Sequence, residues 1–244
     1  SILAHALRLA PYKDGFLTQT LPPGGAIRGT EFNPELQAAV ATLSAGPVTI
    51  NDGANLTNAS LVAMSCRSDG MILKPARPAT ALDQTLIEAA FSPSSGPWNE
   101  RSEVWGTYSE VSGLRWFHVL AADLQASVNI SLAELSQSTL PPESPEPTGS
   151  WIGFTTAHGG GTFEAWHLDT SGSINLSPRS LPDFEVIHVA PIMSNGWAML
   201  GDLSKWVPTS AQRFSVVTAQ DDHVLLHIHM SSAAPEELSF DFAR

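Results

Sequence analysis

The sequence predicts a mainly β protein in which a C-terminal antiparallel β-sandwich follows a short piece of a (β/α)8 barrel. Two observations predict this class. Beyond about residue 84, apolar strands recur at the spacing of about 8–12 residues that is typical of sandwiches, with polar or glycine-containing turns between them. Before that point, helical and strand patterns alternate, as in βα units. We therefore expect two domains, over residues 1–83 and 84–244.

The barrel-like segment is clearest over residues 38–83, which read as a helix, a buried strand, a polar loop, a second helix and an extended Pro-rich exit. Asn33 and Pro34 are suited to the N-cap and first turn of a helix that runs to about Leu43. Gly46-Pro47 breaks this helix, and a short buried strand over 47–50 leads to Asp52. A second helical stretch covers 61–66. A complete barrel needs eight such units and about 250 residues, so we expect this segment to be the tail of a larger architecture.

The second part of the chain is expected to be almost entirely strands. A loop or linker rich in Pro, Ser and Glu, at residues 139–150, interrupts them. The expected strands are 102–109, 114–120, 128–132, 151–156, 162–168, 184–190, 196–201, 213–218, 223–230 and 238–242.

Charge and hydropathy exclude several classes of partner. The formal net charge is −12, and no basic stripe occurs, so nucleic acid and anionic membrane surfaces are poor partners. No apolar run approaches the length of a membrane span, so no membrane insertion is expected. A hydrophobic content of 43% is ample for a core.

Four asparagines head N-x-S/T sequons and indicate a secreted or vesicular protein that is glycosylated. They are Asn55, Asn58, Asn129 and Asn175. The single Cys66 cannot form an intrachain disulfide, and a buried small hydrophobe is the simpler interpretation. An interchain disulfide to a partner is the alternative.

Five segments resemble the family-36 glycoside hydrolases, especially the branch of raffinose synthases and alkaline α-galactosidases. Residues 34–52 (PELQAAVATLSAGPVTIND) are similar to its helix-strand segment, and 69–83 (DGMILKPARPATALD) to its exit from the last barrel strand. Residues 14–18 (DGFLT) resemble the turn after the seventh strand, with glycine in place of methionine. Residues 105–113 and 184–201 match sandwich strands more loosely. The resemblance implies barrel strands 7 and 8 followed by the β-sandwich.

The same resemblance implies that this chain holds no catalytic residue. Family members use two carboxylates, in a K-x-D turn and an R-x-x-D-type turn, and retaining hydrolysis needs both. No K-x-D precedes residue 34. We expect the pair on a missing N-terminal barrel region or on a companion chain, with an oligosaccharide or galactoside as substrate. Neither a cofactor nor a metal is expected.

Asp14 and Asp52 are the predicted substrate-binding residues. Both follow predicted barrel strands, and barrel ligands bind at the carboxyl ends of the strands. Their carboxylates would accept hydrogen bonds from sugar hydroxyls. The alternative for Asp52 is that it accepts backbone N–H groups of the following loop.

Two other features are interpreted structurally. His223, His227 and His229 are expected to be solvated on one strand face, since no fourth ligand accompanies them. Most tryptophans are expected in the sandwich core. The alternatives to an enzyme part are a non-catalytic carbohydrate-binding or structural β-sandwich protein, and a processed fragment of a storage or matrix protein.

Overall fold

The computed structural model describes residues 2–9, 11–20, 29–91, 103–156, 162–169, 171–230 and 238–244, and within them the protein is mainly β. Its strands form one six-stranded sheet and three strand pairs, and all the ladders between these strands are antiparallel. The predicted mainly β class with antiparallel sheets is confirmed, and the layers are compatible with a sandwich.

The six-stranded sheet has the order β1-β2-β3-β8-β5-β6. Its two longest strands, β3 and β8, are neighbours at its centre. Because both faces of β3 are covered, its sequence is an almost unbroken apolar run, buried from Trp116 to Ala122. The bounds are β1 (Thr80–Ala81), β2 (Glu103–Val111), β3 (Leu114–Leu124), β5 (Trp151–Thr155), β6 (Ala165–Leu168) and β8 (Arg179–Pro191).

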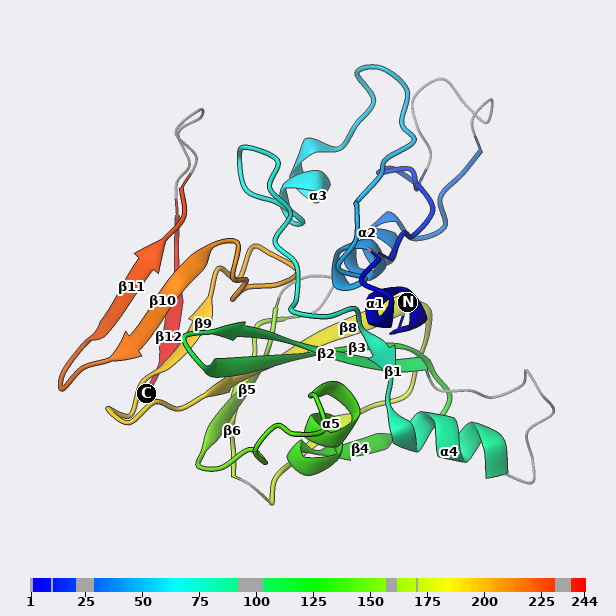
Figure 1. Ribbon diagram of the computed structural model, residues 1–244. Helices are drawn as coiled ribbons and strands as arrows, with labels where there is room; N and C mark the ends of the chain where they lie inside the picture. The colour runs from blue at the N-terminus through cyan, green and yellow to red at the C-terminus, as the bar shows by residue number, and fades with distance from the viewer. Residues whose placement is uncertain are drawn as a thin grey trace.

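The three strand pairs and five helices are arranged around this sheet (Figure 1). The pairs are β4 (Val128–Ser131) with β7 (Ser173–Leu176), β9 (Ala198–Gly201) with β12 (Asp241–Ala243), and β10 (Phe214–Ala219) with β11 (Val224–Ile228). The helices are α1 (Ile2–Ala6), α2 (Pro34–Leu43), α3 (Ala59–Ala63), α4 (Asp83–Phe91) and α5 (Leu132–Thr139).

Alternate residues of β3 face opposite sides of the sheet, and each side has its own cover. Phe117 and Val119 belong to a buried cluster that includes residues of α5, β4 and β7. Leu120 and Ala122 point to the other side and join a cluster with α2. On that side Trp116, near the start of β3, joins residues of β9 and β10. Figure 1 shows α2 and α5 on opposite sides of the sheet.

Several elements differ from the sequence-based expectation. Residues 47–50 form no strand, but Ile50 makes an isolated parallel bridge with Phe16. The chain leaves β4 at Ser131, because this residue caps α5 in a capping box: its hydroxyl accepts the Glu134 N–H, and its own N–H donates to the Glu134 carboxylate. Helices α4 and α5 and strand β7 were not expected. The N-cap predicted at Asn33 is confirmed, since its side chain accepts a hydrogen bond from the Leu36 N–H.

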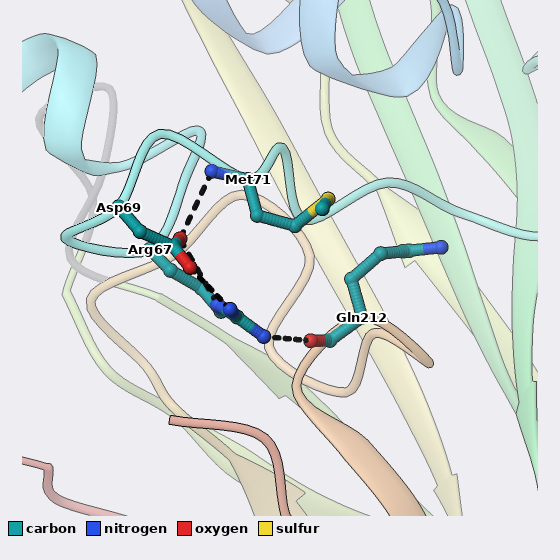
Figure 2. A network of polar contacts seen from close by, with 4 residues as sticks. All are labelled: Arg67, Asp69, Met71 and Gln212. Atoms are coloured by element: carbon teal, nitrogen blue, oxygen red, sulfur yellow. Dashed lines mark hydrogen bonds and ion pairs between the residues drawn. The ribbon is translucent and has the colours of Figure 1, made fainter. Parts of the chain in front are cut away.

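A polar network joins the turn after α3 to the segment before β10 (Figure 2). The Arg67 guanidinium pairs with the Asp69 carboxylate and donates from Nη1 to the Gln212 carbonyl oxygen at 3.0 Å. Asp69 also accepts the Met71 N–H at 3.1 Å. The hydrogen bond from Arg67 is the main reason that the pKa of Asp69 is lowered. Residues 67–71 are therefore tied to the C-terminal part of the chain.

A buried lysine makes a second connection between the residues around α3 and the C-terminal part of the chain. Lys205 Nζ donates to the carbonyl oxygens of Ala63 at 2.8 Å and Cys66 at 3.2 Å, at the C-terminal end of α3. A cation is favourable there because it satisfies helix-end carbonyl groups. The next residue, Trp206, donates its backbone N–H to the Met64 carbonyl oxygen at 3.0 Å.

Candidate functional site

A parallel bridge brings together two loops that are far apart in the sequence. Phe16 N–H donates to the Thr49 carbonyl oxygen at 3.3 Å, and Asn51 N–H donates to the Phe16 carbonyl oxygen at 2.8 Å. At Gly15, an added Cβ would lie 2.5 Å from the Asn51 side-chain oxygen, so the two loops are in close contact. The residues that follow Phe16 and Ile50 therefore emerge side by side.

The Asp52 carboxylate holds these two loops together. Its Oδ1 accepts the Thr18 N–H at 3.0 Å, and its Oδ2 accepts the Thr18 hydroxyl at 2.6 Å. The Thr18 hydroxyl oxygen in turn accepts the Asn58 N–H at 2.7 Å. Asn58 caps α3 by accepting the Leu61 N–H at 3.3 Å. Asp52 thus accepts a backbone N–H group, but from the partner loop and not from the loop that follows it.

Asp14 lies apart from this network. Its carboxylate is exposed and accepts the N–H of the next residue, Gly15, at 2.8 Å. The backbone carbonyl of Asp14 accepts a hydrogen bond from Lys13 Nζ at 3.1 Å. Asp14 and Asp52 therefore occupy adjoining loops, but Asp14 has a partner in its own loop and Asp52 has one in the other loop.

A polar cleft of about 530 Å³ opens beside the Thr18–Asn58 contact. Residues 32–35 and 182–184, which are distant in sequence, both line it. They are joined by a hydrogen bond from Asn33 Nδ2 to the Pro182 carbonyl oxygen at 2.6 Å. Neither Asp14 nor Asp52 lines the cleft. The residues that do are Thr18, Gln19, Thr20, Phe32, Asn33, Pro34, Glu35, Asn58, Ser60, Leu61, Met64, Pro182, Asp183 and Phe184.

The chemistry of the polar cleft suits a hydroxyl-rich ligand. Hydroxyl, amide and carboxylate groups can exchange hydrogen bonds with neighbouring sugar hydroxyls, and Glu35 and Asp183 provide the carboxylates. Phe32 is 66% exposed and offers an apolar ring face. Sequence reasoning missed Glu35, Phe32 and Asp183, because they come from α2, the segment before it and β8, and only the fold brings them together.

The four sequon asparagines are all exposed, and two of them face each other. Asn129 in β4 and Asn175 in β7 are cross-strand partners, so their side chains lie on the same face. Asn55 has a positive φ of 63° in its loop. Asn58 lines the polar cleft, so a glycan there would compete with any ligand in it. Cys66 is half-buried, and its thiol donates to the Val62 carbonyl oxygen at 3.4 Å.

A chain of buried polar side chains crosses the six-stranded sheet away from both loops. His118 Nδ1 lies 2.8 Å from His188 Nδ1, and His118 Nε2 lies 3.0 Å from the Ser109 hydroxyl. Ser109 also contacts the Thr209 hydroxyl at 3.2 Å. Burial lowers the pKa of His118 to about 3. Although a serine and a histidine are adjacent, each of these four side chains is 1% exposed, so no substrate reaches them.

The described part of the chain contains no group of three or more His, Cys, Asp or Glu side chains placed to hold a metal ion. His223 instead contacts its neighbour Asp222, with 2.7 Å between Nδ1 and Oδ1. Among the described residues, no helix has the length and apolar character to cross a membrane.

Comparison with known proteins adds no assignment. No family model matches the chain, and no curated protein matches it.

Proposed function

We propose that this chain is the C-terminal portion or subunit of a carbohydrate-active enzyme that resembles retaining α-galactosidases and raffinose synthases of family 36. In this proposal residues 1–83 supply strands 7 and 8 of a (β/α)8 barrel, and residues 84–244 the β-sandwich. The observation that carries it is the parallel bridge between Phe16 and Ile50 with the polar cleft beside it. Barrel strands are parallel, and their ligands bind at the strand ends.

The polar cleft supplies sugar contacts in this proposal, and the two predicted aspartates have different tasks. Asp52 is a positioning residue, because it holds Thr18 at the edge of the cleft through two hydrogen bonds. Glu35 and Asp183 accept hydrogen bonds from sugar hydroxyls. Asp14 contacts sugar only where the substrate extends beyond the cleft.

The catalytic carboxylates are proposed to come from a companion chain or a further barrel region. Retaining hydrolysis needs a nucleophile and an acid/base about 5–5.5 Å apart, one on each side of the scissile bond. Such a partner would have about 40–60 kDa, since six βα units and an N-terminal domain need that much chain. The exposed sequons at Asn55, Asn129 and Asn175 support a secreted or vesicular setting for the assembly, with Asn58 free of glycan so that the polar cleft stays open.

A second candidate is a non-catalytic carbohydrate-binding module. It is favoured because both predicted aspartates accept hydrogen bonds from N–H groups of this chain, which suits a binding role and not a catalytic one. The two proposals agree that the polar cleft binds sugar. They differ in whether a companion adds hydrolysis.

The first test is calorimetric titration of raffinose and of maltose into the full chain. We expect raffinose to bind with millimolar affinity and maltose, which has no galactose, to bind more weakly. Glu35→Gln and Asp183→Asn should each weaken raffinose binding by about five-fold, because a hydrogen bond to a charged group is lost. Asp221→Asn, on an exposed turn, is the matched control and should change nothing.

The second test is the composition of the native preparation by intact mass spectrometry and native size. A co-purifying chain whose presence confers α-galactosidase activity supports the enzyme proposal. A single 26.0 kDa species that binds raffinose supports the binding module. A single species that binds neither sugar would overturn both.

A further inference from the structure

A second cavity, of about 650 Å³, lies between the N-terminal helices and one face of the six-stranded sheet, where β2, β3 and β8 line it. Its walls are mainly aliphatic: α2 contributes Leu36 and Val40, and β3 contributes Leu120 and Ala122. This volume is in the range of sites that bury a drug-sized molecule. We refer to it as the apolar cleft. It shares no lining residue with the polar cleft.

Two aromatic side chains, Trp105 and Tyr12, also line the apolar cleft. The indole N–H of Trp105 donates to Glu103 Oε2 at 2.7 Å, which fixes the ring and the carboxylate relative to each other. Tyr12 is 59% exposed and stands at the solvent side. Tryptophan and tyrosine faces attract organic cations through their quadrupoles.

Two carboxylates, those of Glu103 and Asp123, and one ammonium group line the apolar cleft. Glu103 is the cross-strand partner of Ala122, so it lies close to Asp123, the next residue of β3. The hydrogen-bond donors to these two carboxylates, the indole of Trp105 and the amide of Gln125, are neutral and leave both negative charges in place.

Lys13 is the single lysine among the lining residues, and its one positive charge is outnumbered by the two carboxylates. The Lys13 ammonium donates to the Asp14 carbonyl oxygen and lies 5.6 Å from the ring centroid of Phe16. The whole chain, with a net charge of −12, also attracts cations and repels anions.

We infer that the apolar cleft binds an amphipathic organic cation, a tertiary or quaternary ammonium with an apolar body. The aliphatic walls would cover the apolar body. The ammonium group would lie against Trp105 and between the carboxylates of Glu103 and Asp123. A fatty acid with an apolar chain as long as that of the cation would suit the same aliphatic walls. Its carboxylate, however, would lie against the like charges of Glu103 and Asp123.

The test is calorimetric titration of three probes into the full chain, below their micellar concentrations. We expect decyltrimethylammonium to bind saturably with one site. Decyl sulfate should bind at least about ten-fold more weakly, because its charge is repelled. Tetramethylammonium should bind at least about 100-fold more weakly, because it lacks the apolar chain.

Two kinds of variant locate the site. Val40→Trp fills the cleft from α2 and should abolish binding, with Leu225→Trp on the exposed face of β11 as its control. Asp123→Asn removes one charge at a residue with φ of 49°, a conformation that asparagine tolerates well. It should weaken decyltrimethylammonium about three-fold and leave decyl sulfate unchanged or tighter.

The Asp123→Asn variant keeps the test decisive if Val40→Trp fails to fold. Equal binding of the cationic and anionic probes would overturn the inference. So would multi-site detergent adsorption, an unchanged cation affinity in Asp123→Asn, or no binding of decyltrimethylammonium.

Discussion

At the scale of single residues, the buried histidines illustrate how the core of the sheet accommodates polar groups. His118 and His188 are directly opposite each other on β3 and β8, and their Nδ1 atoms are 2.8 Å apart. That distance has room for one hydrogen, so one ring donates and the other accepts. Ser109 supplies a hydroxyl to the far side of the His118 ring. The pair remains favourable while His118 is neutral.

This arrangement predicts that the protein loses stability in acid. The pKa of His118 is about 3 in the folded protein, against about 6.5 in an unfolded chain. The unfolded state therefore takes up a proton below pH 6.5 that the folded state does not. The unfolding free energy should decrease by up to about 1.4 kcal/mol per pH unit as pH falls from 6.5 toward 3, on account of this residue.

Urea denaturation at several pH values measures this dependence. The His118→Gln variant should be less stable at pH 7, and its stability should decline less steeply in acid. His167→Gln, on the exposed side of β6, should retain the wild-type slope. If the unfolding free energies of wild type and His118→Gln decreased with equal slopes in acid, His118 would not be the cause of the pH dependence.

The sequence could indicate some single-residue roles but not their partners. The N-cap at Asn33 was readable because Pro34 follows it and helical spacing begins there. Asp52 could be recognised as a loop acid, but its partner Thr18 is 34 residues away. The carboxylates of the polar cleft were not recognisable, since Glu35 reads as an exposed helix residue and Asp183 as a loop residue.

At the scale of elements, α2 and the loop that follows it hold the N-terminal segment by close backbone contact. Gly46 is buried where the helix ends, and a Cβ there would lie 1.5 Å from the carbonyl oxygen of Pro11. The two segments can approach this closely only because residue 46 has no side chain.

We expect Gly46→Ala to lower the unfolding free energy by about 2 kcal/mol or more, because the backbone of Pro11 must move. Gly15→Ala is the matched control. Its Cβ would also be too close to a neighbour, at 2.5 Å, but that neighbour is the exposed side chain of Asn51, which can rotate away. Its cost should stay within about 0.5 kcal/mol. Equal losses in the two variants, measured by thermal unfolding, would refute this distinction.

Strands were more predictable than short helices. The expected segments at 114–120 and 151–156 correspond to β3 and β5, because runs of large apolar residues between turn signals mark buried strands. Helix α5 was missed although Ser131 and Glu134 have capping-box spacing, since the preceding apolar strand residues dominated the pattern. The three-dimensional pairing of β4 with β7 had no local signal.

At the scale of the whole molecule, the order of strands shows that segments from both sides of residues 140–150 share one sheet. β2 and β3 come before this segment, whereas β5, β6 and β8 come after it, and β3 pairs with β8. Most of its residues are exposed. The segment therefore connects strands of one sheet, and its composition alone left a loop and a linker equally open.

Cutting this segment should leave the protein assembled. A recognition sequence for a site-specific protease, inserted at residues 144–146, would allow the chain to be cut into two fragments. We expect them to co-elute in gel filtration and to separate only in denaturant, because the β3–β8 ladder and its buried faces remain. An uncut sample carrying the same insertion is the control. Separation of the fragments under native conditions would contradict the shared sheet.

The interleaved strand order also governs the order of events during synthesis. The ribosome completes β3 long before it makes β8 (Arg179–Pro191). During that time the free edge of β3 in the apolar β2–β3 hairpin has no β8 to pair with. An unpaired apolar edge is where nascent chains associate wrongly. Yield in a heterologous host should thus be governed by how well chaperones protect the β2–β3 hairpin until β8 emerges.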